Sequence, residues 1–352
     1  MPPFQLFLAG LFMFLSATLA EKSSGWGPRD WKGLVTFGDS YTDDSRFEYF
    51  ESHNNTPPPV GWEPPINNNT YSGGYTWGHF ASQAANLTRF NYAVNGASCS
   101  NNITPRKYPP MNVWFRSVLE YEIPAYIADS EYVDAAGYRF MDIEPDETVY
   151  SIWIGTNDLG NGAFLTDSQV NNATIPDYIN CVYTVLDKVY DNGGRYFVIM
   201  NLAPLQLAPQ YATPENGGVA ATPGYPNKGP NITEISYRMW EAVATANEVY
   251  HYRTPFEAVI ADRYPEAQLA LMDMNGLISE IYRNPIEYLA APANVMGFIN
   301  HCDLRKIHCQ RQPNAASYLW FDELHPSERT HETLAKEFVN VVHGYSRWAE
   351  YY

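Results

Sequence analysis

The sequence is short of basic residues. Its 352 residues include 22 Lys and Arg against 39 Asp and Glu, which gives a formal net charge of −17 at pH 7. A surface of this sign repels nucleic-acid phosphates and anionic lipid headgroups, so neither is expected as a partner. After its first twenty residues the chain also lacks any apolar run long enough to cross a bilayer. Neutral ligands such as sugars or esters suit this charge balance better.

Cysteine is scarce as well, with four in the chain. None lies in a spacing typical of a zinc site, so no metal and no other cofactor is predicted. Four cysteines fit an oxidising compartment. Cys302 and Cys309 are close in sequence and are expected to form a disulfide, which would leave Cys99 with Cys181. Four cysteines nevertheless allow three pairings.

The chain begins with a segment typical of secreted proteins. Residues 1–20 are nearly all apolar and carry no charged side chain. Thr18 and Ala20 suit the small −3 and −1 positions of a signal-peptidase site, although the segment lacks the usual basic residue near its start. A cleaved secretory signal is therefore predicted over 1–20. The remaining residues, 21–352, are expected to form one domain, because a chain of this length that is 45% hydrophobic can bury one large core.

Six Asn-x-Ser/Thr sequons are spread along the chain. Each alone is weak evidence, but six together with a secretory signal favour a glycosylated, extracellular protein. The acceptor asparagines are Asn54, Asn68, Asn86, Asn102, Asn172 and Asn231.

Short apolar runs alternate with segments of helical periodicity. The runs, which predict strands, are Leu34–Phe37, Tyr92–Val94, Val149–Ile154, Tyr196–Met200 and Leu269–Met272. Helices are expected around 182–189, over 232–264 with a break near Pro255, and from Pro326 or Ser327 onward. This alternation favours an α/β fold with a parallel sheet covered on both faces. Two segments rich in Pro, Asn and Gly, 56–74 and 203–230, are expected to be binding loops or glycosylated surface.

Ser40 and His325 are the most informative residues of the chain. Ser40 ends a Gly-Asp-Ser stretch directly after the first apolar run, which places its hydroxyl at the end of a strand. A serine hydroxyl is a poor nucleophile until an oriented imidazole takes its proton. Asp322 lies three residues before His325 and can hold that imidazole in one tautomer. We therefore predict a nucleophile, an orienting acid and a base, while a capping serine and a helix-terminal charge are the alternatives.

Gly96 and Asn157 are predicted to complete an oxyanion hole. Each follows an apolar run, and ligands of parallel sheets bind at the carboxyl ends of the strands. The backbone N–H groups of Ser40 and Gly96 and the side-chain amide of Asn157 would donate to the tetrahedral intermediate. The alternative is that both residues lie in ordinary strand-end turns. Asp39 and Asp158, beside two of these residues, are expected to bind backbone N–H groups and shape the loops.

Together these blocks resemble the SGNH hydrolases, also called the GDSL esterase/lipase superfamily. The matching stretches are Phe-Gly-Asp-Ser-Tyr at 37–41, Asn-Gly-Ala at 95–97, Gly-Thr-Asn-Asp at 155–158 and Asp-Glu-Leu-His-Pro at 322–326, in the family's order. The family's serine, glycine, asparagine, histidine and acid map to Ser40, Gly96, Asn157, His325 and Asp322, and Tyr41 stands where many members have Leu. The resemblance implies a flavodoxin-like, three-layer α/β/α sandwich with a roughly five-stranded parallel sheet. The Gly-x-Ser-x-Gly elbow of another hydrolase superfamily is absent around Ser40.

A narrower resemblance rests on Trp-Lys-Gly-Leu at 31–34 and Tyr-Thr-Asp-Asp-Ser-Arg at 41–46. These stretches are similar to fungal secreted acetylesterases of carbohydrate esterase family 16. The resemblance implies a monomeric serine esterase that removes acetyl groups from hemicellulose-derived oligosaccharides, with a small acetylated sugar as its partner. The alternatives are a lipase or phospholipase acting on longer acyl chains and a non-catalytic glycan-binding protein. Five aromatic residues are expected either to stack on sugar faces or to fill the core: Trp62, Tyr71, Tyr75, Trp77 and Trp153.

Overall fold

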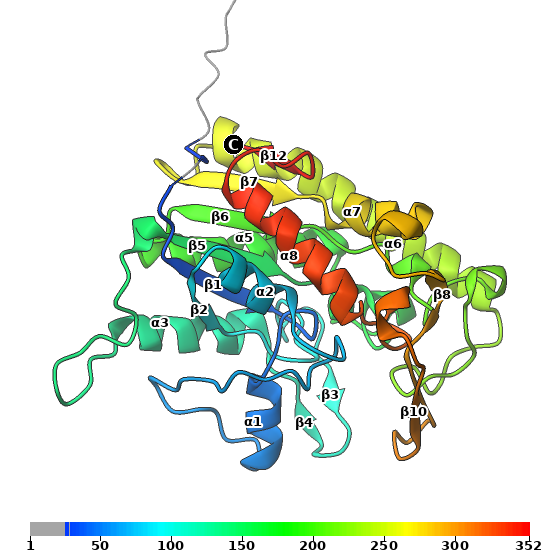
Figure 1. The fold of residues 1–352 in the computed structure, drawn as a ribbon. Helices are drawn as coiled ribbons and strands as arrows, with labels where there is room; N and C mark the ends of the chain where they lie inside the picture. Colours follow the sequence, from blue (N-terminus) through cyan, green and yellow to red (C-terminus); the bar gives the residue numbers. More distant parts are fainter. Residues whose placement is uncertain (1–24, 28) are drawn as a thin grey trace, which may run out of the picture.

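The computed structural model describes residues 25–27 and 29–352 (Figure 1). The predicted secretory signal, residues 1–20, lies outside the described residues. A six-stranded sheet crosses the middle of the molecule in the order β12-β7-β6-β5-β1-β2. Its strands are β1 (Gly33–Gly38), β2 (Thr88–Asn91), β5 (Thr148–Trp153), β6 (Tyr196–Met200), β7 (Gln268–Met272) and β12 (Ala349–Tyr351).

Five of these strands are parallel and one is antiparallel. β2, β1, β5, β6 and β7 pair in parallel, and β12 pairs with β7 in the opposite direction. Every residue of β1 and β5 is buried, as expected for central strands that are covered on both faces. The predicted parallel sheet of about five strands is therefore confirmed, with one antiparallel strand added at its edge by the last residues of the chain.

Helices cover both faces of the sheet. The α-helices of the described residues are α1 (Arg46–Ser52), α2 (Trp77–Ala84), α3 (Ile123–Glu131), α4 (Thr156–Leu159), α5 (Ile175–Asp191), α6 (Ile232–Pro255), α7 (Met274–Arg283) and α8 (Glu328–Val342), of which α1 stands apart from the sheet (Figure 1). α2 and α8 pack together over one face, where the rings of Trp77 and Phe338 lie 4.8 Å apart, while α5 packs against α3 and α6 on the other face (Figure 1). This is the three-layer sandwich that the sequence predicts.

The ends of α8 and α6 follow from local chemistry. The Ser327 side chain accepts a hydrogen bond from the Thr330 N–H and caps α8, so the helix begins at Glu328. α6 ends at Pro255, as the expected break requires, and a π-helical turn follows over Phe256–Ile260.

The predicted strand over Tyr92–Val94 is wrong, because β2 ends at Asn91. The Tyr92 and Val94 N–H groups still donate to carbonyls of the β1 segment. The Asn91 side chain, however, accepts from the Ala93 N–H and donates to the Thr42 carbonyl, which turns the chain out of regular pairing. A side chain that binds its own backbone in this way competes with a strand ladder.

Three pairs of short strands lie outside the main sheet. They are β3 (Lys107–Tyr108) with β4 (Val113–Trp114), β8 (Asn294–Phe298) with β11 (Tyr318–Trp320), and β9 (Asn300–Cys302) with β10 (Cys309–Arg311). The β9–β10 hairpin projects from the body of the molecule (Figure 1). One disulfide, Cys302–Cys309, spans this hairpin, and the other, Cys99–Cys181, ties the loop after β2 to α5. These are the pairs that the sequence favours among its three options.

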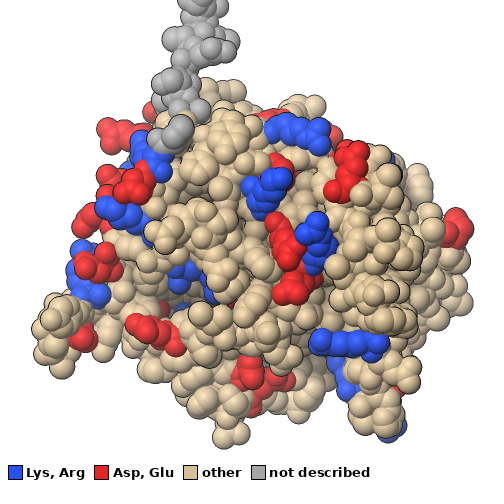
Figure 2. Space-filling model, in the orientation of Figure 1, with Lys and Arg blue, Asp and Glu red and all other residues tan. Residues whose placement is uncertain are grey.

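The surface carries few charges on the face shown in Figure 2. Basic side chains there are scattered among acidic ones, and wide areas between them carry no charge. No helix of the described residues is both long and apolar enough to cross a membrane.

Candidate active site

Three neighbouring strands deliver the candidate residues to one edge of the sheet. Ser40 follows β1, Asn157 lies in α4 directly after β5, and Gly96 lies in the loop beyond β2. β1 lies between β5 and β2, and all three strands are parallel, so their carboxyl ends meet at the same edge.

Ser40, His325 and Asp322 form a continuous hydrogen-bonded chain. His325 Nε2 lies 2.8 Å from Ser40 Oγ, and its Nδ1 lies 2.7 and 2.9 Å from the two Asp322 oxygens. A carboxylate only accepts, so Nδ1 carries the proton and Nε2 faces the serine hydroxyl as an acceptor. This is the geometry in which an imidazole can take the hydroxyl proton.

The environment of Asp322 keeps it ionised. Burial alone would raise the pKa of this carboxyl. The adjacent His325 imidazole and hydrogen bonds from the Leu324 and His325 N–H groups outweigh burial and hold the pKa below its usual range. The carboxylate is therefore available to stabilise an imidazolium on His325.

A tight loop before α8 carries both of these residues. The Phe321 N–H donates to the His325 carbonyl at 2.7 Å and closes the loop. Tyr41 supports this loop, because its hydroxyl donates to the Leu324 carbonyl at 2.8 Å and its ring lies edge-on to the His325 imidazole. The ring of Tyr71, 4.8 Å away, covers the imidazole too. Tyr41, which departs from the usual Leu of the family pattern, thus anchors the histidine loop.

The predicted oxyanion donors lie around Gly96. This residue has φ +80°, and a Cβ here would lie 2.2 Å from the Phe115 ring, so only glycine fits. Among the described residues, the N–H groups of Ser40 and Gly96 donate to no other protein atom. The Asn157 amide donates to the Ala97 carbonyl at 2.8 Å and keeps its second hydrogen. The site thus offers three donors in one region.

Arg106 is a part of this site that the sequence motifs do not indicate. Its guanidinium donates to Asn157 Oδ1 at 2.5 Å and to the Gly96 carbonyl at 3.1 Å. It therefore contacts two of the three residues that provide oxyanion donors.

Two buried acids hold the surrounding loops, as the sequence predicts. Asp39 accepts from the Tyr41 N–H, and Asp158 accepts from the Cys99 N–H and the Thr104 hydroxyl. Burial raises the pKa of Asp39 to about 7 and that of Asp158 to about 6. Asp158 therefore ties the Asn157 segment to the loop after Gly96, and Asp39 holds the turn that carries Ser40.

A groove of about 560 Å³ opens beside the candidate triad. Tyr71, Phe321 and Asp322 line it, and the disulfide-bridged β9–β10 hairpin adds Lys306, whose ammonium lies 5.3 Å from the centre of the Tyr71 ring. Side-chain amides of Asn67, Asn69 and Asn300 also line the groove. The walls are therefore mostly polar, with three aromatic residues, Phe47, Tyr71 and Phe321, among them.

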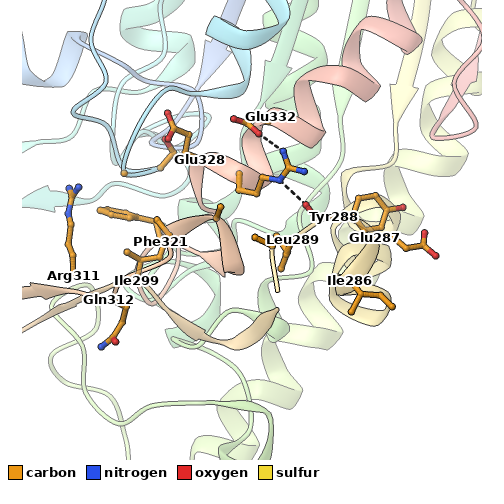
Figure 3. Close-up of a pocket in the computed structure, with 16 residues that line it drawn as sticks. Ile286, Glu287, Tyr288, Leu289, Ile299, Arg311, Gln312, Phe321, Glu328 and Glu332 are labelled. Carbon is orange, nitrogen blue, oxygen red and sulfur yellow. Dashed lines mark hydrogen bonds and ion pairs between the residues drawn. The ribbon is translucent and has the colours of Figure 1, made fainter. Parts of the chain in front are cut away.

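A second hollow, of about 600 Å³, shares Phe321 and Arg311 with this groove. In Figure 3 these two residues lie on one side of the hollow, and Tyr288 and Ile286 lie on the other. Arg329 joins its walls by donating to the Tyr288 carbonyl and to Glu332. The Phe321 ring, with the Arg311 guanidinium 5.2 Å from its centre, thus stands between two neighbouring hollows.

The structure corrects part of the expected aromatic platform. Trp77 and Trp153 are buried in the core and donate to the Thr42 hydroxyl and the Asn201 carbonyl, so neither can stack on a sugar. The rings of Trp62 and Tyr75 contact Tyr49 and His79 respectively. Of the five, Tyr71 contacts the candidate histidine.

Two other expectations concern sites away from the triad. All six predicted glycan-acceptor asparagines have exposed side chains. Within the part of the chain that the structure describes, no group of three or more His, Cys, Asp and Glu residues is arranged to hold a metal ion.

A family model and a curated relative show the family of the chain. The model of the GDSL-like lipase/acylhydrolase family matches residues 34–338. An acetylesterase of Hypocrea jecorina is 39% identical over 325 residues, which cover 92% of each chain. An acetylesterase of Thermothelomyces thermophilus is 23% identical and covers 89% of each chain. Among solved structures, an acetylxylan esterase from Geobacillus stearothermophilus aligns with 90% of this chain and 95% of its own, at 12% identity and a TM-score of 0.41.

Proposed function

The chain belongs to the GDSL-like lipase/acylhydrolase family and is an ester hydrolase, and from that premise we propose that it is a secreted acetylesterase. Its substrates would be acetyl esters of small sugars and hemicellulose-derived oligosaccharides. The observation that carries the catalytic part is the 2.8 Å contact between His325 Nε2 and Ser40 Oγ, continued to Asp322.

Acylation begins at Ser40. Its Oγ attacks the ester carbonyl carbon while His325 Nε2 takes the hydroxyl proton, and Asp322 stabilises the imidazolium that forms. The carbonyl oxygen becomes an oxyanion held by the N–H groups of Ser40 and Gly96 and by the Asn157 amide. The intermediate then collapses. The sugar oxygen leaves with the proton from His325, and the acetyl group stays on Ser40.

Deacylation repeats these roles with water. His325 takes a proton from a water molecule, whose oxygen attacks the acetyl carbonyl on Ser40. The same donors hold the second oxyanion, and the proton returns to the Ser40 oxygen as acetate leaves. The protein's own groups supply every proton transfer and every oxyanion contact in this scheme.

The groove beside the triad supports a sugar as the leaving group. Its amide side chains can exchange hydrogen bonds with sugar hydroxyls, and the rings of Tyr71 and Phe321 can pack against apolar sugar faces. The similarity to an acetylesterase over nearly the whole chain supports acetyl as the acyl group.

A lipase would need an apolar lid near the serine. Exposed apolar side chains gather at the end of α6 and just beyond it: Tyr252, Phe256, Val259 and Ile260. α6 leads back from the carboxyl end of β6 toward the start of β7, so this end of the helix lies at the sheet edge opposite Ser40. These side chains therefore provide no cover for a long acyl chain at the candidate site.

The same proposal includes three further points: the protein is secreted, it is glycosylated, and residues 21–352 form a monomeric enzyme of one domain. Two disulfides and six exposed acceptor asparagines support an extracellular location. Enzymatic removal of N-glycans should lower the mass of the secreted protein, and light scattering should give the mass of one chain.

Acyl preference tests the proposal against its alternatives. Turnover of 4-nitrophenyl acetate should exceed that of the octanoate, and Ser40→Ala should abolish both. A preference for octanoate would favour a lipase. Binding of oligosaccharides without any Ser40-dependent turnover would favour a glycan-binding protein.

A further inference from the structure

Arg106 lies where the two candidate oxyanion loops meet. One of its nitrogens, Nη1, donates both to the Asn157 side-chain oxygen at 2.5 Å and to the Gly96 backbone carbonyl at 3.1 Å. Asn157 belongs to the segment after β5, and Gly96 to the segment after β2. A single guanidinium thus joins two loops that are far apart in the sequence.

We infer that Arg106 is a positioning residue of the oxyanion hole, which holds the Asn157 amide and the Gly96 loop in their donating orientation. The inference rests on the proposed function, because the oxyanion is the species that these donors would bind. Arg106 acts through Asn157 and Gly96 and needs no contact of its own with the substrate.

The chemistry of the amide explains why a cation is needed here. An asparagine side chain can present either its oxygen or its nitrogen after a half turn about its last bond. A guanidinium only donates, so the Asn157 oxygen must face Arg106. The nitrogen then faces the Ala97 carbonyl, at 2.8 Å, and keeps one hydrogen for the oxyanion. With the amide reversed, an oxygen would face the developing negative charge and oppose it.

The position of Arg106 is itself fixed. The Phe115 N–H donates to the Arg106 carbonyl at 2.9 Å, which closes the base of the β3–β4 hairpin. The Arg106 guanidinium lies 5.3 Å from the centre of the Phe115 ring. The same ring lies against Gly96, where it leaves no room for a side chain. Arg106, Phe115 and Gly96 therefore pack as one unit.

The charge of Arg106 persists in this site although burial opposes it. Burial lowers the pKa of its guanidinium, and the opposing influence of Tyr211, Asp158 and Asp39 offsets this only in part. An arginine side chain remains protonated at any working pH. The donor that holds the Asn157 oxygen is therefore constantly present.

Steady-state kinetics on 4-nitrophenyl acetate test the inference through a double-mutant cycle. Arg106→Met should lower kcat roughly 10- to 100-fold with little change in KM, because the donors act on the transition state. Asn157→Ala should lower kcat roughly 10²–10³-fold. In the Asn157→Ala background, Arg106→Met should slow the enzyme by less than it does in the wild type, since only the contact with the Gly96 carbonyl is then left for it to remove. Arg106→Lys should recover part of kcat.

Arg116→Met is the matched control. Arg116 comes from the same region, is also partly buried and lies over the Phe50 ring at 4.7 Å, but it donates to the Asn55 carbonyl, away from the donors. Its replacement should leave kcat unchanged. An unchanged kcat in Arg106→Met, an equal loss in Arg116→Met, or a full Arg106 effect in the Asn157→Ala background would overturn the inference.

A second measurement is independent of turnover. In ¹⁵N-labelled protein, the Asn157 side-chain amide gives a pair of signals that Asn157→Ala identifies by their loss. Arg106→Met should shift or broaden this pair, and Arg116→Met should not. An undisturbed pair in Arg106→Met would contradict the inference even if the protein proved to have no esterase activity. Absence of Ser40-dependent turnover with a disturbed pair would instead contradict the proposed function alone.

Discussion

Replacing Gly96 with alanine should destabilise the protein more than the same change at Gly162. Both glycines have φ +80°, a region that costs an L-residue about 1–2 kcal/mol. Nothing lies within 4 Å of a Cβ at Gly162, so that conformational cost is the whole effect there. At Gly96 the new Cβ would lie 2.2 Å from the Phe115 ring, against an ordinary carbon–carbon contact of about 3.5–4 Å.

The ring cannot retreat freely, because Arg106 lies over it and the backbone of Phe115 is bound to the hairpin base. Overpacking of this kind costs about 1–3 kcal/mol. Gly96→Ala should therefore lower the free energy of unfolding by about 2–5 kcal/mol, and Gly162→Ala by about 1–2 kcal/mol. Urea denaturation of both variants beside the wild type measures the difference.

The same substitution should also reduce activity. Movement of the Gly96 N–H by even a few tenths of an ångström weakens one oxyanion donor, and loss of such a donor costs roughly 10²–10³ in kcat. Gly162→Ala should keep the wild-type kcat. Equal stability of the two variants would contradict the clash with Phe115, and equal kcat would contradict the role of the Gly96 N–H as a donor.

Three further predictions concern the triad, its supporting tyrosine and the buried acid of the serine motif. Asp322→Asn should lower kcat by a factor of about 10⁴, because an amide nitrogen facing His325 favours the wrong tautomer of the imidazole. Stopped-flow assays measure this loss, and a much smaller one would contradict the role of Asp322. Tyr41→Phe should lower the free energy of unfolding by about 1–3 kcal/mol in urea denaturation, because the partly buried Leu324 carbonyl loses its donor, and unchanged stability would contradict this. Burial raises the pKa of Asp39 to about 7, above its value of about 4 in an unfolded chain. The folded protein therefore binds the Asp39 proton more tightly than the unfolded chain does. The stability that this protonation contributes is fully present below about pH 4 and is lost as the pH rises through about 7. Because an asparagine side chain does not titrate, Asp39→Asn should remove this pH-dependent loss of up to about 4 kcal/mol in the free energy of unfolding. Parallel curves of stability against pH for the two proteins would contradict this expectation.

Residues in short motifs were the part of the site most open to prediction. Ser40, Gly96 and Asn157 could be placed together because each follows an apolar run and parallel strands end at a common edge. His325 and Asp322 could be paired with each other because they lie three residues apart. Local sequence was sufficient in these cases.

Arg106 could not be predicted in the same way. It reaches Asn157 and Gly96 only because the β3–β4 hairpin, whose strands have two residues each, folds back against the segment around Gly96. Strands this short leave almost no periodic signal in a sequence. The role of the residue depends on contacts between segments that no local pattern connects.

The aromatic residues show a similar limit. From composition alone, Trp77 and Trp153 could either fill the core or stack on a bound sugar. Packing between segments that are distant in the sequence places both of them in the core. Trp77 is buried against Phe338 of α8, more than two hundred residues away in the chain. Tyr71 was placed at the groove by a loop with no regular structure of its own.

The most direct test of the proposed activity is acetate release from acetylated xylo-oligosaccharides by the wild type beside Ser40→Ala. His325 lies 2.8 Å from the serine oxygen, so we expect acetate from the wild type and almost none from the variant. Equal release by the two proteins would contradict the role of Ser40. No release by either protein, under conditions in which the wild type hydrolyses 4-nitrophenyl acetate, would contradict the sugar substrate.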